Sequence, residues 1–203
     1  ALSTVEGPFG LMLGGNRRDP LDDVRIVEGL VRLVTALPAV AVLRCDHGAL
    51  GAFAFGAVAG SIGITAGARH FTLPGERAFA DVEDRSPRVY WPFAQTWRKG
   101  SLFAQMGPID LLRCFCTVCQ GKSLSRFHSQ ETTIEAAKHS VACWRSTAVD
   151  LRAKSGSARQ DEWIKLCALA YANLDILEAD QQLLFPPSKQ LKAWLRFAGV
   201  PAI

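Results

Sequence analysis

Short apolar runs without charged residues alternate with amphipathic stretches over the first 65 residues. Residues 8–15, 39–43 and 61–65 are runs with the length and composition of buried strands. Between the first two runs, apolar residues recur with helical spacing over residues 24–34, and a short helix is predicted over residues 49–57. Strands and helices therefore alternate, which predicts consecutive βαβ units and a parallel sheet.

The longest amphipathic stretch covers residues 131–151. Its apolar side chains recur with helical spacing, at Ile134, Ala137, Val141, Trp144, Ala148 and Leu151. At about 100° per residue these side chains form one face of a helix, and His139 and Cys143 fall on the other side. The pattern therefore predicts that His139 is not a core histidine.

The chain is expected to have two parts. Residues 72–112 are rich in proline and charge, and no element is assigned to them. Downstream, helices are predicted over residues 163–177 and 191–197, in addition to the helix described above. We expect an α/β part over residues 1–112 and a mainly helical part over residues 113–203.

Composition indicates a globular protein of a reducing compartment. The 203 residues are 49% hydrophobic and 21% charged, and no leader-like segment is visible. Residues 48–68 contain no charged residue, but their six glycines favour a helix and a buried strand over a membrane span. The six cysteines, three of them within six residues, favour metal binding over disulfides. We therefore expect a cytoplasmic protein without a membrane segment.

The positive charge is concentrated in one stretch. Residues 113–165 contain nine basic and five acidic residues, while the two types are equal in number in the rest of the chain. A basic metal-binding part is what contact with a phosphate backbone requires. The alternative is a solvated helix face of mixed charge.

Three cysteines, Cys114, Cys116 and Cys119, form a Cys-x-Cys-x-x-Cys motif that indicates a metal site. With one histidine they make a Cys₃His set, which zinc binds tetrahedrally in structural sites. Cysteines this close in sequence cannot pair with one another without strain. The alternative interpretation is three free thiols.

The fourth ligand has three candidates. His139 lies 20 residues after Cys119 on the predicted helix. His128 follows Cys119 by nine residues in a polar loop, and Cys143 lies one helical turn beyond His139. His139 is the preferred ligand, with an ordinary exposed histidine as the competing interpretation.

The order of these features resembles the C-terminal half of the tRNA-guanine transglycosylases. The resemblance covers about residues 9–144: a Gly-Leu-x-Leu-Gly strand, a helix ending in Leu-Pro, a Gly-rich βα unit, and the cysteine motif with its helical histidine. It implies a partial (β/α) TIM-barrel-like sheet followed by a zinc-binding, mainly helical subdomain. It also implies exchange of guanine for a 7-deazaguanine base in tRNA or DNA. A barrel needs more strands than are visible, so a second chain could complete it.

Carried over to this sequence, the resemblance assigns roles to single residues. Cys114, Cys116, Cys119 and His139 match the structural zinc ligands. Gly10 and Leu11 match the backbone that binds the purine at the carboxyl end of a strand. Ser61 stands where the family has its nucleophilic aspartate.

Asp46 is the substitute candidate for the catalytic carboxylate. It follows the strand of residues 39–43, beside Arg44 and His47, and a carboxylate there could act as nucleophile or base. The alternative is that Asp46 caps the helix starting near Gly48. A non-catalytic accessory subunit in which zinc only supports the fold is the alternative function.

Overall fold

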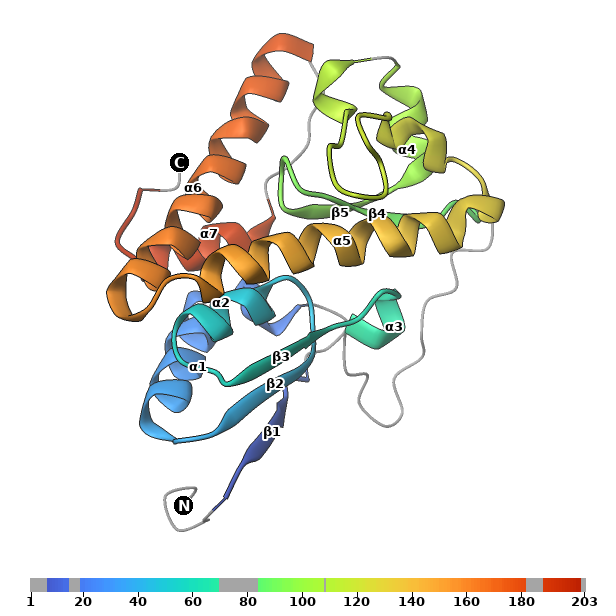
Figure 1. Ribbon diagram of the computed structural model, residues 1–203. Helices are drawn as coiled ribbons and strands as arrows, with labels where there is room; N and C mark the ends of the chain where they lie inside the picture. The colour runs from blue at the N-terminus through green and yellow to red at the C-terminus, as the bar shows by residue number, and fades with distance from the viewer. Residues whose placement is uncertain (1–6, 15–18, 70–83, 108, 182–187, 202–203) are drawn as a thin grey trace. The chain divides into compact units, whose positions relative to one another are not determined.

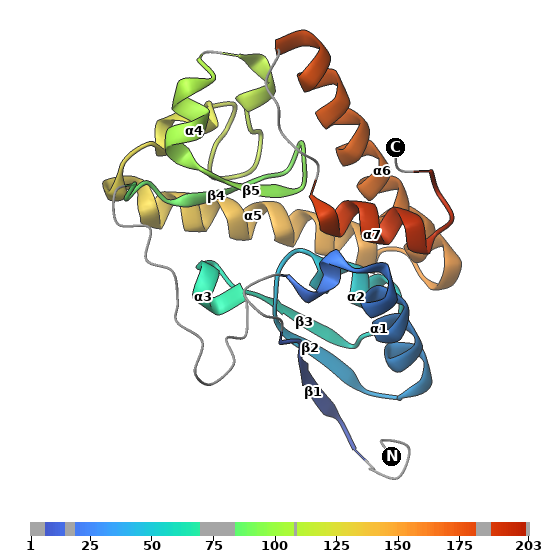
Figure 2. The same ribbon diagram turned by 180° about the vertical axis from the view of Figure 1, so that it is seen from behind.

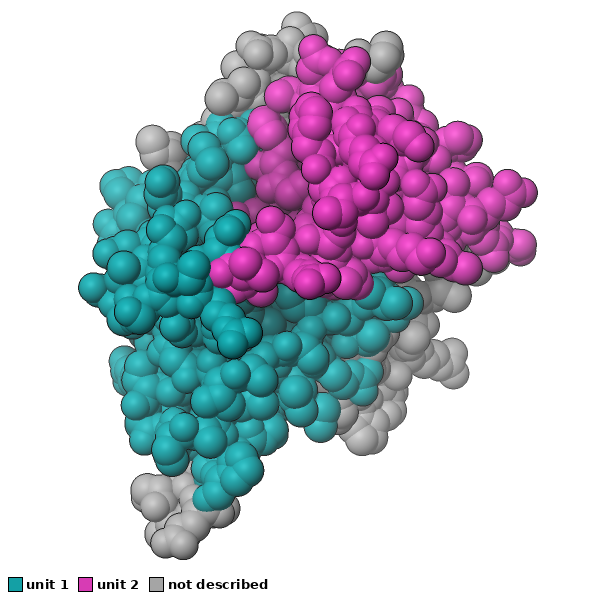
Figure 3. Space-filling view, viewed as in Figure 1, with its two compact units in different colours: residues 1–77, 150–203 teal, residues 78–149 magenta. Residues whose placement is uncertain are grey.

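The computed structural model describes residues 7–14, 19–69, 84–107, 109–181 and 188–201 (Figure 1). The chain forms two compact units (Figure 3). Unit 1 combines residues 1–77 with residues 150–203, and unit 2 is residues 78–149. These divisions differ from the expected boundary after residue 112, so the cysteine motif shares its unit with residues 84–107 and not with the C-terminal helices.

Unit 1 contains the parallel sheet that the apolar runs predict. Its strands are β1 (Phe9–Met12), β2 (Val40–Cys45) and β3 (Ala59–Ile62), in the order β1-β2-β3. Phe9 pairs with Val40, and Ala41 pairs with Ala59, all in parallel register. Neighbouring strands are also consecutive in sequence, as in a singly wound sheet.

The helices of unit 1 begin with a 3₁₀ turn, η2 (Pro20–Asp22), and continue with α1 (Val24–Ala36), α2 (Gly48–Ala54), α3 (Ala66–Arg69), α6 (Gly156–Gln181) and α7 (Lys189–Phe197) (Figures 1 and 2). The Asp19 side chain accepts from the Leu21 N–H and caps the 3₁₀ turn, and Asp23 caps α1. Right-handed crossovers between consecutive parallel strands place α1 and α2 on one face of the sheet, where the two helices are in contact.

Small residues in α2 explain the glycine-rich, uncharged stretch. A side chain at Gly51 would overlap the indole rings of Trp163 in α6 and Trp194 in α7, both of which are fully buried. A side chain at Gly60 in β3 would touch Ala49 of α2 at 3.2 Å. The glycines thus permit close helix and strand packing. Across the described ranges, no helix has both the length and the apolar character needed to cross a bilayer.

The two faces of the sheet differ in burial. Val40 and Val42 point to the buried face, which the helices cover. On the opposite face Gly10 and Ala59 are exposed, and Met12 is 50% exposed. The unequal burial gives the strands one face toward the helices and one open face.

Unit 2 is built from a hairpin, a set of short turns and one long helix. Strands β4 (Arg88–Trp91) and β5 (Thr96–Lys99) pair antiparallel, and α4 (Gly100–Gln105) follows directly. The 3₁₀ turns η3 (Asp110–Leu112), η4 (Leu124–Phe127) and η5 (Gln130–Thr132) lead to α5 (Thr133–Arg152). The hairpin and α4 lie in the stretch for which the sequence predicted no element.

Aromatic side chains form the core of unit 2. Tyr90, Trp97 and Trp144 meet edge to face, with ring centroids 5.1 to 5.8 Å apart. Trp91 packs against Phe103 in the same way at 5.4 Å. These contacts attach the hairpin to α5 and α4, and so fix the frame in which the cysteine motif lies.

Candidate metal centre

The cysteine motif forms a tight loop closed by its own backbone. The Gly121 N–H donates to the Cys114 carbonyl at 2.8 Å, and the Lys122 N–H donates to the Cys119 carbonyl at 3.0 Å. Gln120 and Gly121 have φ values of +51° and +86°, a conformation that returns the chain sharply. The loop therefore directs its three thiols to one side.

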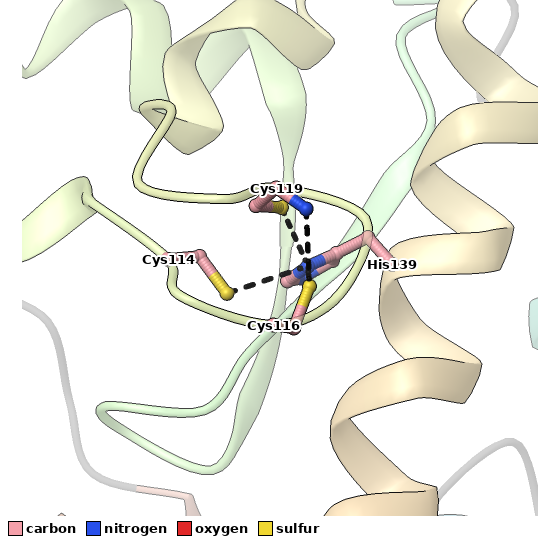
Figure 4. Close-up of side chains that lie close together, drawn as sticks. All are labelled: Cys114, Cys116, Cys119 and His139. Atoms are coloured by element: carbon pink, nitrogen blue, oxygen red, sulfur yellow. Dashed lines mark hydrogen bonds between the residues drawn. The ribbon is translucent and has the colours of Figure 1, made fainter.

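His139 of α5 completes the cluster (Figure 4). Its Nδ1 lies 3.1 Å from the Cys119 sulfur, 3.5 Å from Cys116 and 3.7 Å from Cys114. Its Nε2 lies 2.7 Å from the Tyr90 carbonyl oxygen. Since a carbonyl can only accept, Nε2 carries a proton, and Nδ1 is the ring atom that faces the sulfurs.

The distances from the His139 nitrogen to the three sulfurs are close to those of a tetrahedral site. The four ligand atoms all lie within 4.8 Å of one another. Sulfur at about 2.3 Å and nitrogen at about 2.0 Å from one ion would be separated by roughly 3.5 Å. The observed sulfur–nitrogen distances fall around that value. Cys114, Cys116, Cys119 and His139 could therefore bind a metal ion.

The other two candidate ligands lie outside this group. His128 is exposed, with its Nδ1 3.2 Å from the Ser125 carbonyl. Cys143 is buried beside the cluster, 3.7 Å from His139 Nδ1 and 4.0 Å from the Cys114 sulfur. His139 is the histidine that the structure places among the three thiols.

The predicted apolar face of α5 is right only in part. Trp144 and Leu151 are buried, but Ile134 is 71% exposed and Val141 is 48% exposed. The expectation that His139 is not a core histidine is wrong, because His139 is fully buried and Cys143 nearly so. Hydrophobic periodicity missed this because it counts histidine as polar. Here the polar atoms of the ring are satisfied by the sulfurs and by Tyr90, so the histidine can be buried.

The cluster would release protons when it binds a cation. The hydrogen bond with Cys114 and burial raise the pKa of the Cys119 thiol to about 11, against the lowering effect of His139 and Arg126. Burial by itself lowers the pKa of His139, but hydrogen bonds with Cys114, Cys119 and Tyr90 outweigh it and raise the pKa to about 11. Metal binding requires thiolates and a neutral ring, so it displaces these protons.

Arg126 supports the cluster from the η4 turn. Both terminal nitrogens of its guanidinium lie 3.4 Å from the Cys119 sulfur, and one of them donates to Glu135 at 2.8 Å. The guanidinium also lies 4.0 Å from the centroid of the Phe127 ring. Such contacts orient a ligand and moderate its charge. This role could not be predicted from the sequence, where Arg126 is only a basic residue between the cysteines and the helix.

We expect Arg126→Gln to weaken metal binding by about ten- to a hundredfold, because the sulfur loses its two charged donors. Competition with a chromophoric chelator measures the affinity. Arg145→Gln removes the same charge from an exposed position of α5 and should leave the affinity unchanged. Equal affinities for wild type and Arg126→Gln would show that the guanidinium has no role at the cluster.

In unit 1, Asp46 is held by neighbouring groups. Its Oδ1 accepts from the His47 backbone N–H at 2.7 Å and lies 3.3 Å from the His47 ring, and its Oδ2 lies 3.7 Å from the Arg69 guanidinium. Burial opposes ionisation, but these contacts lower the pKa to about 2. The side chain does not cap α2, whose N-cap is His47 without a side-chain bond. Arg69 lies 23 residues away in sequence, so the pair was not predictable from local pattern.

The remaining predicted site residues lie on the strands of the same sheet. Gly10 and Leu11 are in β1, paired with Ala41 and Val42 of β2. The hydroxyl of Ser61 in β3 accepts from the Arg44 N–H at 2.9 Å, where the β2–β3 register shifts. Asp46 directly follows β2, so these residues lie in, or directly after, three neighbouring strands.

Asp19 is a second carboxyl group of unit 1 with a displaced pKa. Burial, followed by the negative charge of Asp46, raises its pKa from 3.8 to about 7, against a backbone hydrogen bond from Leu21 and the charge of His47. Its other oxygen accepts from the Gln190 side chain of α7.

This pKa predicts that the stability of unit 1 depends on pH. The folded state holds the Asp19 proton more tightly than the unfolded state, so its contribution is complete below about pH 4 and is lost as the pH rises through 7. Relative to Asp19→Asn, the wild type should therefore lose about one to a few kcal/mol between pH 5 and pH 8. Urea unfolding at both pH values measures this. Parallel profiles for the two proteins would contradict it.

The structure thus defines the chain as a mixed α/β protein with a three-stranded parallel sheet and a Cys₃His cluster able to hold a metal ion. Comparison with protein-family models found no match. Searches of curated proteins and of solved structures found no match either.

Proposed function

We propose that the protein is a tRNA-guanine transglycosylase-like protein that exchanges 7-deazaguanine for guanine in RNA or DNA, with one structural zinc ion in unit 2. The observation that carries the proposal is the Cys₃His cluster, because it brings together the four residues that the resemblance marks as zinc ligands. The strands that would hold the purine and the carboxylate lie side by side in the sheet of unit 1.

Zinc is the proposed metal because of the donor set. Three thiolates and one imidazole suit a borderline-soft cation, and tetrahedral Cys₃His sites are typical of structural zinc. Four protein ligands would leave no open position for water or substrate. The ion is therefore assigned to folding and not to chemistry.

The parallel sheet supports the barrel-like interpretation. Consecutive strands are neighbours and their first two helices lie on one face, as in a (β/α) barrel segment. The other face carries exposed Gly10, Ala59 and Met12 and would be the inner face of the barrel. A second chain would supply the missing strands.

Two carboxyl groups near this sheet have pKa values displaced in opposite directions. Asp46 remains ionised, as a nucleophile at the ribose C1′ must be, while Asp19 titrates near neutrality. In the proposed exchange, Asp46 forms an ester bond to C1′ as the guanine–C1′ bond breaks. Asp19 would protonate the leaving guanine. It would then accept the proton of the incoming base as that base displaces the carboxylate.

The test is incorporation of labelled guanine into tRNA and into DNA by the zinc-loaded protein. Asp46→Asn should reduce incorporation by about a thousandfold or more, because the amide cannot act as the nucleophile. Asp161→Asn, an exposed position of α6 in the same unit, should have no effect. Absence of incorporation by the wild type with both nucleic acids would overturn the proposal.

The second candidate is a non-catalytic, zinc-containing accessory subunit. It is favoured by the contacts of Asp46 with Arg69 and His47, and by the hydrogen bond that occupies the Ser61 hydroxyl. A carboxylate held in this way is a weaker nucleophile than a free one. This candidate predicts binding of nucleic acid without exchange, and an Asp46→Asn variant that binds as tightly as the wild type.

A further inference from the structure

The tip of the cysteine loop carries an exposed aromatic ring. Phe115 lies between two of the clustered cysteines, and it is 81% exposed although it is a large apolar side chain. The loop backbone and the metal ligands fix its position. A side chain at Gly121 would lie 3.4 Å from the Phe115 ring, so the ring stands directly over this glycine.

A basic pocket begins at the same glycine. It has a volume of about 470 Å³ and is lined by Gly121, Arg113, Lys122, Ser123 and Arg126, together with Ile109 and the acidic Asp110. Three of these side chains are cationic, and Ser123 contributes a hydroxyl group. The ring over Gly121 therefore lies beside a pocket with several hydrogen-bond donors and a positive charge.

The pocket cations are available to a ligand to different degrees. Lys122 is exposed and makes no ion pair in the part of the chain that the structure describes. Arg113 pairs with Asp110 at 3.0 Å, but both side chains are largely exposed, and such a pair is weak enough to yield to a phosphate. Arg126 is committed to Cys119 and Glu135. Lys122 and Arg113 are the two expected phosphate ligands.

We propose that Phe115, Lys122 and Arg113 form a binding site for single-stranded nucleic acid. A base stacks on the Phe115 ring while the adjacent phosphates contact the two cations. Exposed aromatic rings beside positive grooves bind single strands in this manner, with a preference for unpaired bases, because a paired base has no free face. The site rests on the proposed function for its choice of nucleic acid.

Fluorescence anisotropy with a labelled mixed-sequence 12-nucleotide RNA tests the site in the zinc-loaded, full-length protein. Phe115→Ala should weaken binding by about five- to a hundredfold, and zinc content should remain at the wild-type value because the ring is exposed. Ile134→Ala, which removes another exposed apolar side chain of unit 2, is the matched control and should have no effect.

Salt dependence tests the phosphate contacts. Lys122→Ala and Arg113→Ala should each weaken binding and reduce the slope of log affinity against log salt by about 0.7. Arg145→Ala, an exposed cation of α5, is the control for general charge. Single-stranded DNA of the same sequence should bind similarly, and double-stranded RNA should bind more weakly and without a contribution from Phe115.

Equal affinities for Phe115→Ala and Ile134→Ala, or a duplex bound as tightly as the single strand, would overturn the site. Competition by inorganic polyphosphate as strong as by RNA would also overturn it, because polyphosphate has no bases to stack. Base exchange is measured separately. If Phe115→Ala loses RNA binding and the wild type shows no base exchange, the site is retained and the proposed function is rejected. If the wild type exchanges bases and Phe115→Ala binds RNA as tightly as the wild type, the proposed function is retained and the site is rejected.

Discussion

Cys116→Ser is expected to abolish metal binding and to unfold unit 2. Cys116 is only half-buried, so the substitution changes packing little and its effect reports on the ligand. Structural zinc contributes about 10 kcal/mol or more to the folding of small domains, and the loss of one thiolate removes several kcal/mol of that. Metal content should fall from one ion per chain to nearly none, and the thermal transition of unit 2 should move to a much lower temperature or disappear.

The matched control is Cys143→Ser. Cys143 lies beside the cluster, 3.7 Å from His139 Nδ1, but outside the group of four ligands. Its replacement should leave one metal ion per chain and a small change in stability. Full metal content in Cys116→Ser together with loss in Cys143→Ser would contradict the assigned ligand set and make Cys143 the ligand. Metal content measured by elemental analysis, with a melt of each protein, decides the question.

Gly100→Ala should be the most damaging single substitution of a non-ligand in unit 2. Gly100 begins α4, and a Cβ there would overlap the carbonyl of Phe127. Neither segment can move away readily: the Gly100 N–H donates to the Pro87 carbonyl at 2.9 Å, and the Phe127 ring is fully buried. A clash between two fixed backbones costs about 3 kcal/mol or more.

Gly29→Ala provides the contrast. Gly29 is an exposed interior residue of α1, and no heavy atom lies within 4 Å of a Cβ built on it. Alanine should therefore stabilise the protein by up to about 1 kcal/mol through helix propensity. Denaturant unfolding measures both variants. A Gly100→Ala protein within 1 kcal/mol of the wild type would show that η4 and α4 can separate more easily than their contact indicates.

Local pattern was sufficient for the sheet of unit 1. The apolar runs identified β1, β2 and β3 within a few residues, and the parallel order follows from the alternation of strands and helices. The glycine-rich stretch resolved correctly into α2 and β3. In unit 2 the hairpin of β4 and β5 was missed, because its short strands carry charged residues such as Arg88 and Lys99 and no clear alternation.

The residues of the Cys₃His cluster could be predicted from the sequence, but the contacts that surround them could not. The spacing of the cysteines identified the thiols, and the choice of His139 agrees with the group the structure brings together. The burial of His139 depends on the Tyr90 carbonyl, 49 residues away in the chain, and on the metal ligands. Likewise, the pairing of Asp46 with Arg69 is a tertiary contact. Such tertiary contacts override the local preferences from which the buried face of α5 and a capping role for Asp46 were predicted.

The discontinuity of unit 1 has a consequence for biosynthesis. Unit 2 is contained in residues 78–149, whereas unit 1 needs Trp163 and Trp194 to complete its core. On the ribosome, the metal-binding unit can therefore fold as soon as its last helix emerges, while α1 and α2, although made first, stay without the helices that pack on them until α7 is synthesised. The usual N-terminal-first order of folding is reversed. A shortage of metal ions during translation would leave nascent chains with neither unit folded, and such chains would be exposed to aggregation and proteolysis.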